Sequence, residues 1–178
     1  GREAGGGRRE AGRGKREEGR GSEGAEKGAW MQKSMSDAGY REQLLERLER
    51  LTPDAKARWG TMTAPQMLAH LADWMLMASG DLKTAARSSV LRYPPIKQLA
   101  IYWLPFPRNV QTSPELLARK PSVWGAEQAS VRERVQSFEK LYVEPPWPEH
   151  PVFGRMTPRA WSVFAYRHMD HHLRQFGI

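Results

Sequence analysis

Apolar residues first recur at helical spacing in the stretch that begins at Asp37. Leucines stand there every three or four positions among Glu and Arg residues: Leu44, Leu45, Leu48 and Leu51. Thr52 and Pro53 then end the run. The pattern predicts an amphipathic helix over this stretch.

A second helix is predicted from Thr63 to Gly80. Thr63 is a favourable N-cap, Pro65 suits the first turn, and Gln66 stands where it can complete a capping box. One face of this helix collects apolar residues and one histidine, namely Met67, His70, Leu71, Trp74 and Ala78. A histidine in the middle of an apolar stripe is expected in the core or at its edge.

Two further helices are predicted in the second half of the chain. The third runs from Gly125 to about Tyr142 and directs four residues inward, namely Val131, Val135, Phe138 and Tyr142. The fourth begins with the N-cap Thr157 and Pro158, runs to Phe176 and stops at Gly177. No segment alternates like a β-strand. The sequence therefore predicts an all-α fold.

The stretch between the second and third helices, residues 81–124, contains six prolines but is otherwise rich in bulky apolar residues. We expect a long, packed connection with a short helix over Ile96–Trp103 and a second turn that starts at Ser113. Prolines at positions 145, 146, 148 and 151 indicate a stiff, extended link to the last helix.

Residues 1–35 differ from the rest of the chain. Ten of the 16 glycines fall within the first 28 residues, mixed with Arg and Glu, and Trp30 is the first large apolar residue. Such a segment cannot bury enough apolar surface to offset its ordering entropy, so we expect a disordered tail over 1–35 and a helical domain over 36–178. A second hypothesis is that the natural chain begins at Met31 or Met35.

Composition narrows the class of protein. The 28 Lys and Arg against 20 Asp and Glu give a net charge of +8, but the cations are scattered, which argues against a nucleic-acid partner. The absence of cysteine excludes disulfides, thiolate zinc sites and a cysteine nucleophile. No stretch has the length of a membrane span or the character of a signal peptide. We therefore expect a cytoplasmic protein.

The histidines are the main candidates for chemistry. His168 and His172 stand four positions apart on the last predicted helix, so their side chains lie about 40° apart around its axis and can converge on one ion. His70 is the best candidate for a third ligand. Three neutral imidazoles would leave coordination positions open and would suit Zn, Ni, Fe or Mn. The alternative is that each histidine hydrogen-bonds a carbonyl or carboxylate in the core.

Other polar residues near this cluster have less definite roles. His171 is expected to face a neighbouring helix or solvent, and His150 is expected in the proline-rich loop. Asp73 could orient an imidazole or lie on the helix surface, and Gln175 could donate to a ligand of the metal or lie at the surface. Because each imidazole must be neutral to bind, we expect metal affinity to fall as the pH drops through about 6.5.

Three motifs resemble the DinB-like superfamily of metal-binding four-helix bundles, whose last two ligands form a His-x-x-x-His pair on the final helix. The motifs are PQMLAHL at residues 65–71, HMDHHLRQ at residues 168–175 and HPVFGRMT at residues 150–157. The last of them resembles the His-Pro-x-Phe-Gly entry to the final helix in a branch described only as a domain of unknown function. The resemblance covers residues 37–178.

The resemblance implies an up-down-down-up bundle with residues 81–124 as the long crossover, and a divalent metal ion held by His70, His168 and His172. Characterised relatives include thiol-dependent S-transferases and a mycothiol-dependent isomerase, in which the metal is thought to activate the thiol of a low-molecular-weight cofactor. The leading hypothesis is thus a metal-dependent enzyme, a thiol-dependent S-transferase acting on a small electrophilic substrate. The alternatives are a hydrolase that uses metal-bound water, and a non-catalytic, stress-related metal-binding protein that could form a homodimer.

Overall fold

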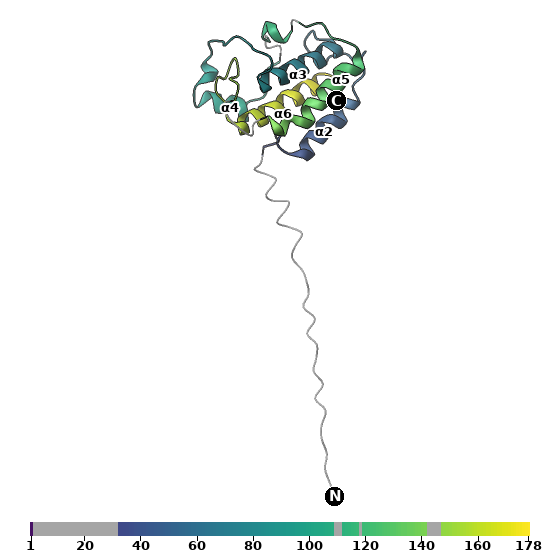
Figure 1. The fold of residues 1–178 in the computed structure, drawn as a ribbon, viewed down its shortest axis with the longest axis vertical. Helices are drawn as coiled ribbons and strands as arrows, with labels where there is room; N and C mark the ends of the chain where they lie inside the picture. The colour runs from purple at the N-terminus through teal and green to yellow at the C-terminus, as the bar shows by residue number, and fades with distance from the viewer. Residues whose placement is uncertain (2–31, 109–111, 118, 142–146) are drawn as a thin grey trace. The chain divides into compact units, whose positions relative to one another are not determined.

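Five α-helices and three short 3₁₀ helices form in the computed structural model, which describes Gly1 and residues 32–108, 112–117, 119–141 and 147–178. The α-helices are α2 (Ala38–Glu49), α3 (Ala64–Ser79), α4 (Ile96–Tyr102), α5 (Trp124–Ser137) and α6 (Pro158–Gln175) (Figure 1). The 3₁₀ helices are η1 (Val90–Arg92), η2 (Pro114–Leu116) and η3 (Phe138–Lys140). The described residues contain no strand, which confirms the predicted all-α class. The predicted tail falls almost entirely outside the described residues.

The predicted caps fix the ends of the long helices. The Asp37 side chain accepts from the Tyr40 amide at 3.1 Å at the start of α2. At the start of α3, the Thr63 amide donates to Gln66 Oε1 at 2.8 Å, and the reciprocal bond completes the capping box. Thr157 caps α6 in the same way, through the Ala160 amide at 3.1 Å. These bonds satisfy amides that a helix leaves unpaired at its first turn.

The helix α5 is shorter than its hydrophobic pattern predicts. It ends at Ser137 and tightens into η3, so the expected α-helix to Tyr142 is wrong beyond that point. The Ser137 hydroxyl donates to the Glu133 carbonyl at 2.9 Å, a local bond that competes with the regular helix ladder. The predicted inward residues Val131, Val135 and Phe138 are buried, and Tyr142 lies outside the described residues.

The core lies where the four longer helices meet. Both α2 and α3 pack against α5 and α6. The most deeply buried apolar side chains come from all four helices, and they include Leu44, Leu48, Met67, Leu71, Val131, Trp161, Met169 and Leu173. Met35 is also fully buried, and its amide donates to the Ser162 carbonyl at 3.0 Å. The predicted apolar faces of these helices therefore form one continuous core.

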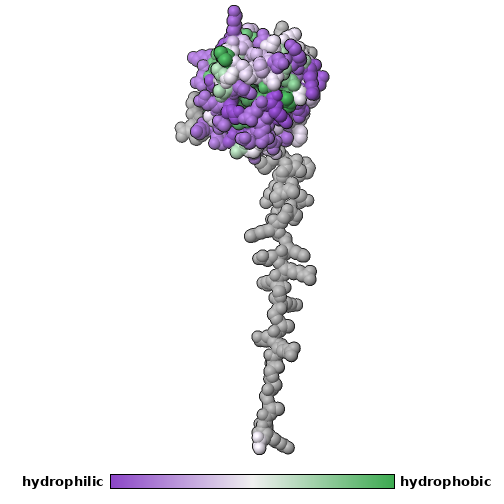
Figure 2. All heavy atoms as spheres, turned by 90° about the vertical axis from the view of Figure 1, so that its right-hand side faces the viewer, coloured by the Kyte–Doolittle hydropathy of each residue, from purple (hydrophilic) through white to green (hydrophobic). Residues whose placement is uncertain are grey.

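Polar side chains cover most of the face seen in Figure 2, and hydrophobic residues show there only as small patches. No described helix combines the length and the apolar character that crossing a membrane requires. The large apolar side chains that are buried come mainly from the four longer helices and form the core between them.

The connection over residues 81–124 contains η1, α4 and η2, close to the predicted short helix and turn. Within it, α4 packs against α6, and the Arg167 side chain of α6 donates to carbonyls at the end of α4, namely those of Ala100, Ile101 and Leu104. A helix leaves its last carbonyls unpaired, so a guanidinium at this end is favourable. Arg167 thereby holds the connection beside α6.

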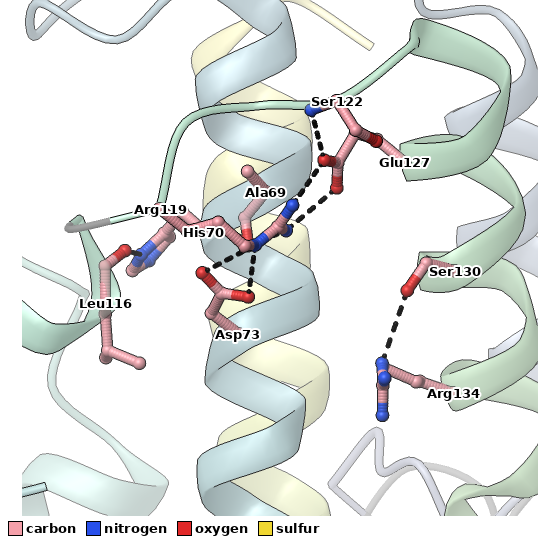
Figure 3. Close-up of polar contacts among 9 residues, drawn as sticks. All are labelled: Ala69, His70, Asp73, Leu116, Arg119, Ser122, Glu127, Ser130 and Arg134. Carbon is pink, nitrogen blue, oxygen red and sulfur yellow. Dashed lines mark hydrogen bonds and ion pairs between the residues drawn. The ribbon is translucent and has the colours of Figure 1, made fainter. Parts of the chain in front are cut away.

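A second arginine ties the other end of this connection to α3 and α5 (Figure 3). The Arg119 Nε donates to the carboxylate of Asp73 on α3 at 2.9 Å, and its Nη2 donates to Glu127 on α5 at 2.9 Å. The Ser122 amide also donates to Glu127 at 2.7 Å. Both carboxylates are buried, so the ion pairs and hydrogen bonds offset the cost of their burial.

We expect E127Q to lower the free energy of unfolding by about 1–3 kcal/mol at pH 7. The hydrogen bond from Arg119 lowers the pKa of Glu127 from 4.5 to about 2. The unfolded chain therefore takes up this proton near pH 4.5 while the folded chain does not, and the stabilisation is complete above that pH and is lost as the pH falls towards 2. Urea unfolding at several pH values measures both effects.

The control for this experiment is E49Q, because Glu49 pairs with Arg132 at the surface, where both side chains are exposed. E49Q should change the free energy of unfolding by less than about 1 kcal/mol. Equal effects of the two variants, or an effect of E127Q that stays constant down to pH 2, would contradict the role of the buried pair.

Candidate metal centre

Three buried imidazoles meet between α3 and α6. His70 comes from the middle of α3, and His168 and His172 stand one turn apart on α6. His168 Nε2 lies 3.3 Å from His70 Nε2 and 3.1 Å from His172 Nε2, and the three potential ligand atoms lie within 4.8 Å of one another. The structure therefore brings together the three histidines that the sequence singled out, and their geometry could hold a metal ion.

Two of the three rings are oriented by hydrogen bonds from their outer nitrogen. His70 Nδ1 lies 3.4 Å from the Leu116 carbonyl of η2 (Figure 3), and His172 Nδ1 lies 2.9 Å from Gln175 Oε1. The Gln175 amide is itself fixed, because its Nε2 donates to the Trp59 carbonyl at 2.8 Å. Since both acceptors are oxygen atoms, each Nδ1 carries the proton and each Nε2 presents a lone pair. This is the usual arrangement of histidine ligands of a metal.

His168 lies between these two lone pairs. Its Nδ1 is buried and has no hydrogen-bond partner among the described residues. A proton on His168 Nε2 could be donated to His70 or to His172, but a single proton cannot serve both. Without a cation, at least one of the Nε2 lone pairs of His70 and His172 therefore has no hydrogen-bond donor in the cluster. A positive ion between the three Nε2 atoms would satisfy all of them, so the residues fit a metal ion.

Burial keeps the three rings neutral. It lowers the pKa of His70 from 6.5 to about 4 and that of His172 to about 3, and it lowers the pKa of His168 well below 6.5. Neighbouring imidazoles add to the effect on His168 and His172. Neutral imidazole is the form that binds metals. The expected fall in metal affinity near pH 6.5 was based on the ordinary pKa of imidazole. Because burial lowers the pKa of all three rings, we expect protons to compete with the metal only at lower pH.

The three histidines form part of the wall of a cavity of about 1310 Å³. The wall comes from α3, α6, the segment before α3, the connection between α3 and α5, and the loop before α6, and it is mostly apolar and aromatic. Its aromatic residues are Trp59, Trp74, Phe106, Phe153 and Phe164. No Asp or Glu is found among the described residues of the wall. The described wall around the triad therefore offers a small molecule mostly apolar contacts and no carboxylate.

The remaining polar candidates have roles that the sequence did not specify. His171 is half-buried and lines the same cavity, and its ring centroid lies 5.6 Å from that of Trp59 and 5.5 Å from that of Phe106. Asp73 is buried rather than at the surface, and its carboxylate pairs with Arg119. Gln175 is buried and orients His172 from its outer side. His150 lies in the predicted loop, but it is buried.

Sequence reasoning missed the backbone carbonyls that complete the site. The carbonyls of Leu116 and Trp59 come from segments far from the histidines in sequence, and they carry no side-chain signal. Arg119 was missed as well, because an arginine that stands between two prolines of the connection has no spacing that could identify its role. Such contacts depend on how the connection folds back onto α3.

A protein-family profile described as "Protein of unknown function (DUF1569)" matches residues 37–177. The match spans α2 to the end of α6 and thus includes all three histidines of the triad. No curated protein and no solved structure matches the chain significantly.

We expect Q175M to weaken zinc affinity by about 10- to 100-fold, because methionine has a similar size but cannot accept from His172 Nδ1. His172 would then lose the bond that fixes its ring and its tautomer. Competition titration of the purified protein with a chelator of known zinc affinity measures the change. Q136M on the exposed face of α5 is the matched control and should leave the affinity unchanged. Equal zinc affinities of the two variants would contradict the role of Gln175 in orienting His172.

Proposed function

Since the chain belongs to the family described as protein of unknown function (DUF1569), its function must be inferred from the site, and we propose an enzyme that uses one divalent metal ion held by His70, His168 and His172. The observation that carries the proposal is the convergence of three neutral Nε2 atoms, two of which have their lone pairs fixed inward. Three nitrogen ligands suit Zn, Ni, Fe or Mn and leave positions open for a reactant.

Thiol transfer is the reaction that we favour. A divalent ion at this position would lower the pKa of a thiol or of water and would polarise an electrophile. The described wall of the cavity lacks a carboxylate that could act as a general base, and a thiol that has already lost its proton needs none. The chain has no cysteine, so the thiol would be a separate low-molecular-weight cofactor. The residues of the cavity would bind the small electrophile and exclude water from it.

Hydrolysis is the second candidate, and His171 is the observation in its favour. This ring lines the cavity beside the triad, and burial lowers its pKa below 6.5, so it is neutral at pH 7. A neutral imidazole can accept a proton from water. A hydrolase would therefore use His171 as its general base, whereas thiol transfer would not require it.

We also propose that α2, α3, α5 and α6 form an up-down-down-up four-helix bundle of the DinB-like type. The packing of α2 and of α3 against both α5 and α6 supports this arrangement, since each helix then has two neighbours around a shared core. The connection that contains η1, α4 and η2 corresponds to the long crossover. The histidine motifs on α3 and α6 support the same proposal.

Elemental analysis of the purified protein should find about one divalent metal ion per chain, and H70A and H168A should lose it, because two imidazoles bind a metal much more weakly than three. H171Q is the control that should keep its metal, since His171 stands outside the triad. Circular dichroism verifies that each variant is folded. A folded parent that takes up no metal after reconstitution, or an H168A variant that retains it, would overturn the proposal.

Thiol dependence distinguishes the candidate reactions. With 1-chloro-2,4-dinitrobenzene and a panel of small thiols, the metal-loaded protein should form the thioether: the C–S bond forms, chloride leaves, and the thiol proton passes to solvent. The rate should be at least about tenfold above that of H168A, because that variant lacks the proposed metal. If a product forms without thiol, and forms more slowly with H171F than with the parent protein, the reaction is hydrolysis. Bound metal without turnover on either route would indicate a non-catalytic metal-binding protein.

A further inference from the structure

His150 stands in a tight loop directly before α6. Its backbone amide donates to the Gly154 carbonyl at 2.9 Å, and the Gly154 amide donates back to the His150 carbonyl at 2.8 Å. Gly154 has a φ of 65°, and a Cβ atom there would lie 3.1 Å from the Arg92 guanidinium. The backbone thus holds the His150 side chain in a defined position.

The hydrogen bonds of this loop fix the tautomer of His150. Its Nδ1 accepts from the Val152 amide at 3.1 Å and from the Phe153 amide at 3.2 Å. An atom that accepts two bonds cannot carry the proton, so the neutral ring has its proton on Nε2. Burial lowers the pKa of His150 to about 3, and the ring is therefore neutral at pH 7. Nε2 is therefore the one hydrogen-bond donor of the His150 ring.

This donor has no acceptor among the described residues. His150 is 6% exposed, and its ring neighbours are aromatic: Phe153 at 4.9 Å, Trp161 at 5.4 Å and Phe164 at 5.3 Å. An aromatic face offers an N–H group only a weak contact. His150 lines the cavity, so a donor without a partner among the described residues can be paired by an acceptor on a ligand in that cavity.

The cavity supplies the place for that acceptor, because His150 forms part of the same wall as the triad. The described wall contains no carboxylate that could accept the bond, and its aromatic and aliphatic residues favour an apolar ligand. We infer that the cavity binds a predominantly apolar small molecule with an oxygen acceptor, such as a carbonyl group, and that His150 Nε2 donates a hydrogen bond to this oxygen. The inference rests on the proposed function in that it places the substrate in the cavity beside the triad.

Two substitutions separate the donor of His150 from its role in the loop. In H150N, the side-chain oxygen stands where Nδ1 stood and can still accept from the Val152 and Phe153 amides, but the donor at Nε2 is lost. In H150Q, the amide nitrogen stands close to the former Nε2, so the donor is kept and the loop acceptor is lost. A merely structural histidine would be replaced better by Asn than by Gln.

A pair of probes of similar size tests the inference. We would measure the dissociation constants of 2-acetylnaphthalene, which carries a carbonyl, and of 2-ethylnaphthalene, which does not, by tryptophan fluorescence of the full-length protein as purified. The ketone should bind the parent about three- to tenfold more tightly than the hydrocarbon, which is the typical effect of one hydrogen bond. H150N should lose this preference without weakening the hydrocarbon, and H150Q should retain it.

Equal binding of the two probes to the parent would overturn the inference, and so would a ketone preference that survives in H150N or is lost only in H150Q. The metal content of each sample is measured in parallel. Samples that take up no metal even after reconstitution but still prefer the ketone through His150 would refute the proposed metal function and leave this inference standing. Metal-loaded samples that lack the preference for the ketone would refute this inference and leave the proposed metal site standing. The failure of one proposal can therefore be distinguished from the failure of the other.

Discussion

A neutral imidazole has two nitrogen atoms and one proton, and this constraint governs the site. Oxygen acceptors at Leu116 and Gln175 hold the protons of His70 and His172 on the outer nitrogens, so the inner nitrogens can only accept. Burial prevents the rings from relieving the conflict by taking up further protons at neutral pH. The cluster could therefore hold a positive ion, and the contacts of Leu116 and Gln175 keep two of its rings in the orientation that this requires.

The same constraint acts in the opposite sense at His150. There two backbone amides occupy Nδ1, and the proton is held on Nε2, for which the described part of the chain offers no acceptor. The cavity thus has lone pairs on one part of its wall and a hydrogen-bond donor on another. Most of the remaining described wall is aromatic or aliphatic, and Arg87 also belongs to it. This division suits a ligand with an apolar body and distinct polar groups better than a highly charged one.

The scaffold fixes these groups through the connection between α3 and α5. Arg119 ties one end of it to the buried carboxylates of Asp73 and Glu127, and Arg167 holds α4 at the other end against α6. The carbonyl of Leu116 lies within this fastened segment. The acidic side chains near the triad are thus used in structural ion pairs, which leaves the described cavity wall without a carboxylate.

Local chemistry determined much of the fold from the sequence alone. Periodicity and capping residues located the long helices, and the spacing of His168 and His172 with the inward face of His70 identified the triad, because helix geometry relates these positions directly. The end of α5 and the low pKa values of the histidines were not predictable in this way. Only the tertiary structure decided them, together with the partners of Asp73 and Gln175 and the tautomer of His150. These properties depend on burial and on backbone groups that are distant in sequence. A local sequence pattern does not predict which distant segments will contact each other.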